Sequence, residues 1–395
     1  MPATERLYYA DSLHLAFEAR VIAVSAFNGA PSVILDRTAF YPEAGGQMAD
    51  RGELAGRRVV DVQVDDDGVV HHMLEGGAAL AVGDEVAGAV DRARRRVHMA
   101  LHTGQHMLSR ALADVARAET VSSRLGETIC TIDLDREAVE EARVAEAEDL
   151  VNSVVDDDVL VRAFFPSAEE LAALPLRRAP KVTENIRVVA VGDFDFTPCG
   201  GTHCTRSAQV GLVRVVGLER YKGKVRLSFS AGGRARAELW REAAVLRELG
   251  KGFTCGPLDV PVAVAKRERE LGEAREALGR VRGRLADALA TSLAAEAAAT
   301  GRAVAVVEDA GPDLLRALAT RITENPSAVA FLAGRGEGGL AVMIARGAAS
   351  TFDCGAFLKR AAAHAGGRGG GRPERAEGRL PESADWAALV SSFAT

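Results

Sequence analysis

Short apolar runs alternate with turn signals through the first 90 residues, a pattern typical of a β-rich subdomain. The runs VIAVSAF (21–27) and SVILD (32–36) flank the turn residues NGAP, which predict a hairpin with a four-residue loop. A second hairpin is expected within RVVDVQVDDDGVVHHML (58–74), turning around Asp65 to Gly68. We therefore predict a β-barrel-like N-terminal subdomain over residues 1–90.

From Asp91 the spacing of apolar residues becomes that of a helix. An apolar stripe runs through residues 91–119 and contains Val97, Leu101, Leu108, Leu112 and Val115. Beyond it the sequence predicts a strand at CTIDLD, a charged helix over residues 136–155, and three more strands at IRVVAVG, VGLVRVVGLE and GKVRLSFSAG. This mixture of elements predicts an α+β domain over residues 91–240.

The remainder of the chain changes character again. Residues 255–300 are dominated by a long charged stretch, which predicts one helix or a helical pair that acts as a spacer or as a dimerisation arm. After it, AVAVVED, SAVAFLAG and LAVMIARG alternate with helical stretches. That alternation predicts a small α/β domain over residues 301–395, so the fold class of the whole chain is α+β.

Composition narrows the choice of function. The formal net charge of −6 argues against a uniformly basic nucleic-acid binder, although RARRR (92–96) forms a local basic patch. Five irregularly spaced cysteines do not make a disulfide framework. The N-terminus lacks the apolar core of a signal peptide, and no window holds eighteen apolar residues without charge. We therefore expect a cytoplasmic protein that does not bind a membrane.

Three of the eight histidines lie four residues apart in HMALHTGQHML (98–108). Neighbours at this spacing lie one turn apart on one face of a helix, which lets two imidazoles share a metal ion. His98 and His106 would be roughly 12 Å apart, so the metal-binding pair is either His98 with His102 or His102 with His106. The alternative is a set of half-buried histidines satisfied by hydrogen bonds.

A second cluster, DFDFTPCGGTHCT (193–205), carries Cys199 and His203 in a glycine-rich loop. A Cys-x3-His loop can complete a tetrahedral site of nitrogen and sulfur ligands, which suits Zn²⁺. The alternative is a reduced cysteine in a tight turn. Cys204 is a competing thiolate, and because adjacent side chains usually point apart, only one of His203 and Cys204 should face a metal.

Three motifs in order, FYPEAGGQMADRG (40–52), HTGQH (102–106) and CGGTH (199–203), resemble the editing domain of alanyl-tRNA synthetases and of the free-standing AlaX editing proteins. The resemblance covers residues 5–235, and we expect no aminoacylation domain before it. Residues 255–395 resemble the C-terminal part of those synthetases, with a glycine-rich segment similar to that of the DHH-associated domain. This order of parts is similar to the long AlaX subgroup.

The resemblance implies one zinc ion per chain, held by His102, His106, Cys199 and His203, and leaves His98 as a structural or RNA-facing residue. It also implies hydrolysis of the ester that joins a wrong amino acid to tRNA for alanine. Serine is the chief expected substrate and glycine a second, because an alanine pocket excludes neither strongly. Four protein ligands close a zinc site, which favours positioning of the tRNA end over activation of water.

Further site residues are expected on the same basis. Thr38 matches the family position that contacts the serine hydroxyl. We assign catalytic or substrate roles to Gln47, which can hydrogen-bond the substrate, and to Asp195, which orients water or a metal ligand unless it is a solvated loop carboxylate. Expected substrate or tRNA contacts are Gly45, Gly46, Ser123, Arg124, Arg368 and Arg372. Where Ser123 and Arg124 stand, the synthetases tend to carry a glutamine.

Three alternatives compete with this hypothesis. A zinc peptidase would need a general base, and HTGQH has no glutamate after its first histidine. A non-catalytic tRNA-binding protein could keep the fold with a structural zinc. Editing of threonyl-tRNA is disfavoured by the GGQ segment. The partners expected are mischarged tRNA for alanine and a second copy of the chain bound through residues 255–395.

Overall fold

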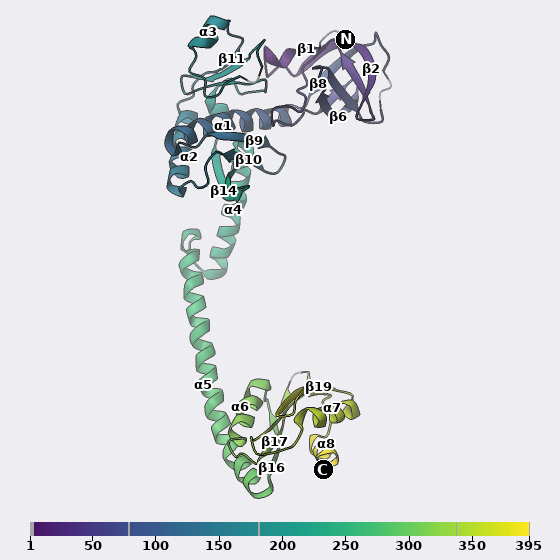
Figure 1. Cartoon of the computed structure of the whole chain (residues 1–395), viewed down its shortest axis with the longest axis vertical. Coiled ribbons are helices and arrows are strands. Elements are labelled where there is room, and N and C mark those ends of the chain that lie inside the picture. Colours follow the sequence, from purple (N-terminus) through teal and green to yellow (C-terminus); the bar gives the residue numbers. More distant parts are fainter. Residues whose placement is uncertain (1–3, 78–79, 181, 337, 395) are drawn as a thin grey trace. The chain divides into compact units, whose positions relative to one another are not determined.

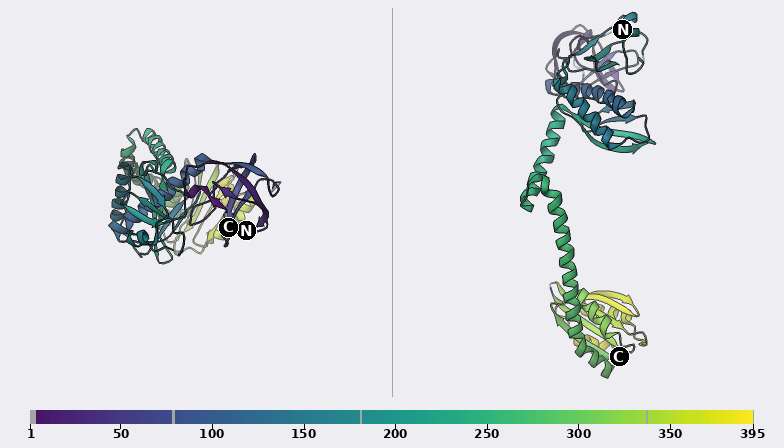
Figure 2. Two further views of the ribbon diagram at one scale, coloured as in Figure 1. Left: turned by 90° about the horizontal axis from the view of Figure 1, so that it is seen from above. Right: turned by 90° about the vertical axis from the view of Figure 1, so that its left-hand side faces the viewer.

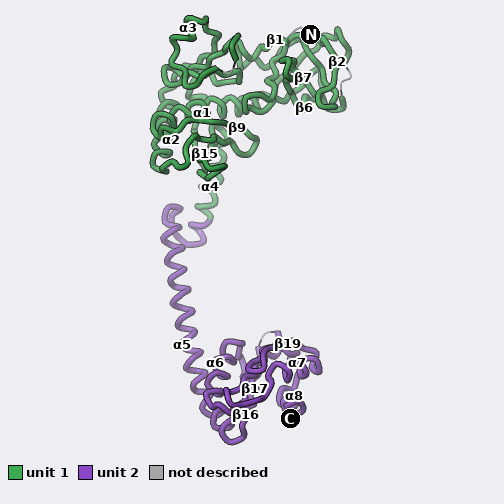
Figure 3. The backbone as a smooth tube through the Cα atoms, viewed as in Figure 1, with its two compact units in different colours: residues 1–248 green, residues 249–395 purple. Residues whose placement is uncertain are grey.

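The computed structural model describes residues 4–77, 80–180, 182–336 and 338–394. Its contacts divide the chain into two compact units, residues 1–248 and 249–395 (Figure 3). Helices and strands are mixed in both units, so the expected α+β class is confirmed. Among the described residues, no helix is both long enough and apolar enough to cross a membrane.

The first unit begins with a closed barrel of six strands (Figure 1). In barrel order these are β2 (Ala16–Phe27), β3 (Ala30–Leu35), β7 (Val70–Leu74), β6 (Arg57–Val64), β5 (Gly52–Leu54) and β8 (Glu85–Val90). The hairpin loop between β2 and β3 is two residues long, not four as expected. Asn28 and Gly29 both have positive φ, 50° and 83°, and this two-residue turn lets the strands continue through Ala30 and Pro31.

The rest of the first unit packs two helices against two sheets. Helix α1 (Arg92–Ala116) is capped by the Asp91 side chain and packs beside α2 (Glu141–Asp156). One sheet has the order β14 (Val213–Tyr221), β15 (Lys224–Ala231), β10 (Cys130–Leu134), β9 (Thr120–Leu125). The other has the order β11 (Val161–Phe164), β12 (Val188–Val191), β13 (Asp195–Pro198). Short elements complete the unit: β1 (Glu5–Arg6), which pairs with β4 (Arg37–Thr38), and α3 (Ala168–Ala173).

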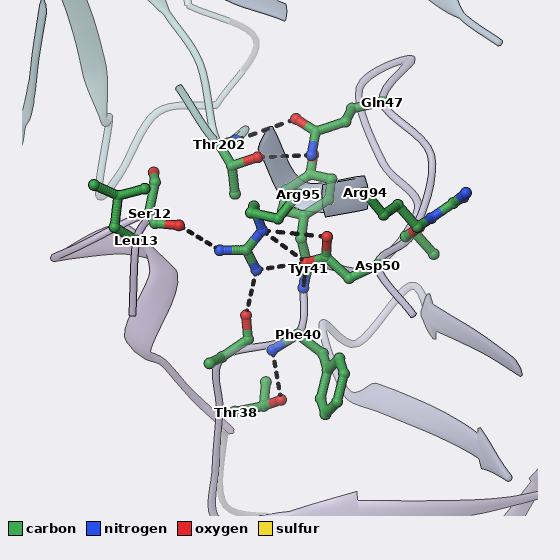
Figure 4. A network of polar contacts seen from close by, with 12 residues as sticks. Ser12, Leu13, Thr38, Phe40, Tyr41, Gln47, Asp50, Arg94, Arg95 and Thr202 are labelled. Carbon is green, nitrogen blue, oxygen red and sulfur yellow. Dashed lines mark hydrogen bonds and ion pairs between the residues drawn. The ribbon is translucent and has the colours of Figure 1, made fainter. Parts of the chain in front are cut away.

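A buried ion pair joins α1 to the loop that follows β4 (Figure 4). The side chains of Arg95 and Asp50 are both fully buried, and Nε of Arg95 lies 3.0 Å from Oδ2 of Asp50. The same guanidinium donates to the carbonyls of Ser12 and Ala39, at 2.6 Å each. One arginine therefore ties the N-terminal segment, the FYPEAGGQMADRG loop and the first turn of α1 together.

Helix α4 (Gly232–Phe253) leads out of the first unit, and the second unit contains α5 (Val260–Thr300). Sequence left open whether residues 260–300 form one helix or two. Figures 1 and 2 show α5 as a single continuous helix. Near its C-terminal end, Ala286, Ala290 and Ala297 are buried in the core of the second unit. This end of α5 is therefore part of the C-terminal fold and not a free spacer.

The second unit is built on a five-stranded sheet with helices on both faces. The strand order is β16 (Arg302–Glu308), β17 (Val329–Gly336), β18 (Gly339–Arg346), β20 (Arg375–Leu380), β19 (Arg368–Arg372). Alternate side chains of β17 and β18 pack against α5 and α6 (Pro312–Ile322) on one face. Those between them pack against α7 (Cys354–Ala365) and α8 (Trp386–Phe393) on the other.

The glycine-rich segment that resembles the DHH-associated domain has regular secondary structure. Residues 368–372 form the edge strand β19, which pairs with β20 along its whole length. Two of the three glycines are needed for close packing: a methyl group on Gly369 would lie 2.8 Å from Cδ2 of Leu358 on α7, and one on Gly371 would lie 2.2 Å from the Arg375 carbonyl oxygen.

Candidate metal centre

Four side chains from two distant segments meet in the first unit. His102 and His106 lie one turn apart on α1, and Cys199 and His203 lie on the loop that follows β13. One potential ligand atom from each residue lies within 4.8 Å of the others. This is the set of four that the resemblance implied, and its members could hold a metal ion.

The spacing between these atoms suits a tetrahedral zinc site. Nε2 of His102 and Nε2 of His203 each lie 3.4 Å from Sγ of Cys199. Zinc bonds of about 2.05 Å to nitrogen and 2.3 Å to sulfur, at a tetrahedral angle, would separate these atoms by about 3.6 Å. The loop also has to approach α1 closely, since a methyl group on Gly201 would lie 2.2 Å from Cε1 of His102.

A polar group lies beside the second ring nitrogen of each histidine. Nδ1 of His102 donates to Oε1 of Gln47 at 2.7 Å. Nδ1 of His203 lies 3.2 Å from Oγ1 of Thr103, and Nδ1 of His106 lies 3.6 Å from Oδ2 of Asp195. The contacts of His102 and His203 are short enough to be hydrogen bonds that fix ring orientation and direct Nε2 at the metal position, whereas Nδ1 of His106 has no hydrogen-bond partner among the described residues.

Burial sets the protonation state of the cluster. It lowers the pKa of His102 to about 3 and holds the pKa values of His106 and His203 well below the usual 6.5. All three rings are therefore neutral at pH 7, which is the form that binds metals. Burial raises the pKa of the Cys199 thiol, so metal binding must displace its proton.

The two alternative metal ligands that the sequence offered, His98 and Cys204, lie outside the cluster. His98 is buried one turn before His102, where burial and the nearby guanidinium of Arg94 lower its pKa to about 4. Cys204 packs in the hydrophobic core, and burial raises the pKa of its thiol to about 11. Of the adjacent pair, His203 faces the cluster and Cys204 faces the core.

A cavity of about 580 Å³ opens beside the candidate metal site. Its lining includes His102 and Cys199 together with Gly45, Gly46 and Ser123, three of the expected substrate contacts. Gly46 has a φ of +87°, and a methyl group there would lie 2.5 Å from the Ser123 carbonyl oxygen. This glycine therefore lets the loop approach β9 at the wall of the cavity.

Other expected site residues lie elsewhere. Gln47 is fully buried and does not line the cavity; besides holding His102, it accepts from the backbone N–H of Thr202 and donates to its hydroxyl, at 3.1 and 2.8 Å. Thr38 is also fully buried, with its hydroxyl 2.8 Å from Nε2 of His72. Arg124 is exposed on β9 outside the cavity lining. Asp195 is buried in an ion pair with Arg177 at 2.8 Å, so it is not a solvated loop carboxylate.

Arg368 and Arg372 belong to the second unit, where both are exposed on β19. The register with β20 places them directly opposite Arg379 and Arg375 respectively. Like charges in directly opposed positions repel one another. Arg375 is already paired with Glu377 at 3.5 Å, so a bound anion would chiefly relieve the repulsion between Arg368 and Arg379.

Sequence reasoning missed two residues that shape the metal loop. Arg187 is buried, and its Nη1 donates to the carbonyls of Cys199 and Gly201, at 3.0 and 2.9 Å. Thr103 accepts from the backbone N–H of Cys204 at 3.0 Å. Thr103 lies inside HTGQH and could have been noticed there. Arg187 lies in no motif, so only the folded chain reveals its role.

Comparison with known families places three models on this chain. The model for class II (A) tRNA synthetases matches residues 4–94. The model for the threonyl and alanyl tRNA synthetase second additional domain matches residues 186–228, which include the Cys199 loop. The DHHA1 domain model matches residues 300–394.

Individual relatives agree with the family models. An alanine–tRNA ligase of Archaeoglobus fulgidus is 34% identical over 97% of this chain and 43% of its own length. One from Halorubrum lacusprofundi is 33% identical over 97% of this chain and 42% of its own length. The alanyl-tRNA editing protein AlaX-L of Pyrococcus horikoshii is 32% identical over 60% of each chain. The resemblance to alanyl-tRNA synthetases and AlaX proteins is confirmed. The chain spans less than two thirds of the length of each of these relatives.

Proposed function

We propose that this protein hydrolyses the ester between a wrongly attached amino acid and tRNA for alanine. One observation carries the proposal: a buried cluster of three neutral histidines and one cysteine opens onto a cavity walled by the glycines of the FYPEAGGQMADRG loop. The similarity to AlaX-L and to the alanyl-tRNA synthetases supports the substrate class.

The residues present fit one zinc ion per chain, held by His102, His106, Cys199 and His203. Zinc supplies Lewis acidity when it is bound. Because four protein ligands would leave no open coordination position, a bound zinc would fix the loop and helix that carry its ligands, and we propose that this positions the end of the tRNA and does not activate water. Gln47 and Asp195 then act as positioning residues, Gln47 by fixing His102 and Asp195 by facing His106.

We propose serine as the preferred amino acid and glycine as a second substrate. Thr38 remains the proposed contact for the serine hydroxyl. Its own hydroxyl donates to Nε2 of His72, because Nδ1 of that ring donates to the Val33 carbonyl. It also accepts from the backbone N–H of Phe40 at 3.1 Å. The donor of Thr38 is therefore engaged, and a contact with serine would use the second lone pair of Oγ1, which can accept a hydrogen bond from the serine hydroxyl.

The second unit supplies a surface for the rest of the tRNA in this proposal. Four exposed arginines share one face of the β19–β20 hairpin: Arg368, Arg372, Arg375 and Arg379. We propose that they bind phosphates of the tRNA backbone. On α5, four exposed apolar side chains recur every seven residues, a spacing that favours a homodimer through paired helices: Val264, Leu271, Leu278 and Leu285. Analytical ultracentrifugation of the whole chain would show whether it is a monomer or a homodimer.

The experiment is deacylation of seryl-, glycyl- and alanyl-tRNA for alanine, with and without a chelator. We expect rapid release of serine, slower release of glycine, little release of alanine, and loss of all activity after zinc removal. Binding of the tRNA without hydrolysis would instead support a non-catalytic protein with a structural zinc. Hydrolysis of peptides would support a zinc hydrolase of another class.

A further inference from the structure

Exposed apolar side chains gather at the cavity beside the metal centre. Val121 is 57% exposed, Phe165 52% and Val182 58%, and all three line that cavity. They come from β9, from the residue just after β11 and from the segment before β12. Grouped, exposed apolar residues around a cavity mark a ligand-binding surface more often than scattered ones do.

The Phe165 ring is held in place from one side. It makes an edge contact with the Tyr9 ring, with centroids 6.0 Å apart and planes at 67°. Tyr9 is itself fixed, because the guanidinium of Arg6 lies 5.6 Å and that of Arg187 5.2 Å from its ring centroid. A fixed aromatic ring with half of its surface exposed is a ready platform for a flat partner.

The charge of the cavity favours an anionic ligand. Among the described residues that line it, three are arginines (Arg6, Arg178 and Arg187) and none is acidic, in a chain whose net charge is −6. Arg178 is exposed and makes no ion pair or side-chain hydrogen bond with any described residue. Aromatic, apolar and cationic groups in one cavity together match a nucleotide.

We propose that the Phe165 ring stacks on the terminal nucleobase of the RNA while Val121 and Val182 pack against that base, and that Arg178 binds the phosphate joining the last two nucleotides. The inference rests on the proposed function. The ester that reacts is carried by the terminal ribose, and the base is bonded to that ribose, so both must occupy one cavity. The serine side chain, with one hydroxymethyl group, and glycine, with a single hydrogen, are too small to cover an apolar rim of this size.

The test compares two short acceptor-stem substrates that carry the same seryl ester, one ending in adenosine and one in an abasic ribose. In the zinc-loaded full chain, Phe165→Ala should raise KM for the adenosine substrate roughly 5- to 150-fold with little change in kcat, the range for one stacked base. On the abasic substrate, Phe165→Ala and the unchanged protein should have equal KM. Phe165→Trp should retain binding, and Trp240→Ala, which removes an exposed aromatic of α4 outside this cavity, is the matched control.

Arg178 is tested with a substrate whose last phosphate is replaced by an uncharged methylphosphonate. Arg178→Gln should weaken binding of the ordinary substrate and have no effect on the modified one. Arg58→Gln changes an exposed arginine of β6 outside the cavity and should leave both unchanged. Equal loss for the two substrates would show that Arg178 binds no phosphate there.

Dissociation constants for a stable amide-linked analogue are measured alongside, so the rim is tested even if the protein hydrolyses neither ester. Failure of hydrolysis with normal, Phe165-dependent binding would overturn the proposed function and keep this inference. Equal losses by Phe165→Ala on adenosine and abasic substrates would assign the rim to the amino acid. If Phe165→Ala did not weaken binding of either substrate, the terminal base would bind outside this rim.

Discussion

Replacing Gln47 by leucine removes three hydrogen bonds that join the FYPEAGGQMADRG loop to the metal centre. Gln47 accepts from Nδ1 of His102 at 2.7 Å and from the backbone N–H of Thr202 at 3.1 Å, and it donates to the Thr202 hydroxyl at 2.8 Å. Leucine leaves two buried N–H groups without partners, at about 1–3 kcal/mol for each unsatisfied group. We therefore expect a lower free energy of unfolding for the metal-free protein.

The larger consequence concerns zinc. Without its acceptor, the ring of His102 can rotate away from the position in which Nε2 faces Cys199, and loss of such a partner typically weakens metal binding 10- to 100-fold. Competition with a chromophoric chelator measures this dissociation constant. Gln47→Glu retains an acceptor for His102 and another for the Thr202 hydroxyl, so it should bind zinc nearly as tightly as the unchanged protein does.

Ser123→Ala provides the control, because Ser123 lines the cavity without being one of the four metal-site residues. It should leave zinc affinity unchanged. The reasoning is refuted if Gln47→Leu keeps full zinc affinity and only raises KM for seryl-tRNA. Gln47 would then bind substrate, as its place in the motif first suggested.

Four further outcomes follow from the same contacts. Cys199→Ala should lose zinc and activity together, whereas Cys204→Ala should keep both; metal analysis of the purified variants decides. Arg95→Met leaves the buried carboxylate of Asp50 unpaired and should lower the free energy of unfolding by about 3–5 kcal/mol in urea titrations. Burial lowers the pKa of His72 from 6.5 to about 4, so the neutral ring contributes fully to the free energy of unfolding above pH 6.5, and this contribution is lost as the pH falls towards 4. Between those pH values the free energy of unfolding of a His72→Leu variant should therefore fall by about 3 kcal/mol less than that of the unchanged protein. Finally, Thr38→Val should slow seryl-tRNA hydrolysis more than glycyl-tRNA hydrolysis, and equal slowing would make Thr38 a structural residue.

The spacing of apolar residues along the sequence predicted individual helices and strands of this fold. The apolar stripe of residues 91–119 became α1, and the alternation in residues 223–232 became β15. The spacing of HTGQH and of CGGTH is also local, and each motif sits on one element or one loop. Residues 368–372 show the limit: three glycines between two arginines carry no strand pattern, and pairing with β20 makes them a strand.

Contacts between distant segments were beyond the reach of such patterns. Gln47 lies 55 residues from His102 and 155 from Thr202, and nothing in its motif distinguishes a buried bridge from a substrate ligand. Thr38 presents the same difficulty, since it lies on β4 and its hydrogen-bond partner His72 lies on β7 of the barrel. Arg187 depends on two carbonyls of a loop that begins 12 residues later.

The arginines of RARRR (92–96) differ in burial because α1 turns their side chains toward different sides. Arg92 and Arg96 are exposed, while Arg95 is fully buried against Asp50. Seven residues separate Arg95 from His102, which places both on one face of α1, roughly 10 Å apart along its axis. The partners of Arg95 and His102 lie three residues apart in the FYPEAGGQMADRG loop: Asp50 binds Arg95 and Gln47 binds His102. The FYPEAGGQMADRG loop is thus attached at two points to the helix that carries His102 and His106, and two points fix its direction as well as its distance. Its glycines can then form the wall of the cavity at a set position from the candidate metal site, which is a reason for a motif of this length to carry both a cavity-lining half and a buried half.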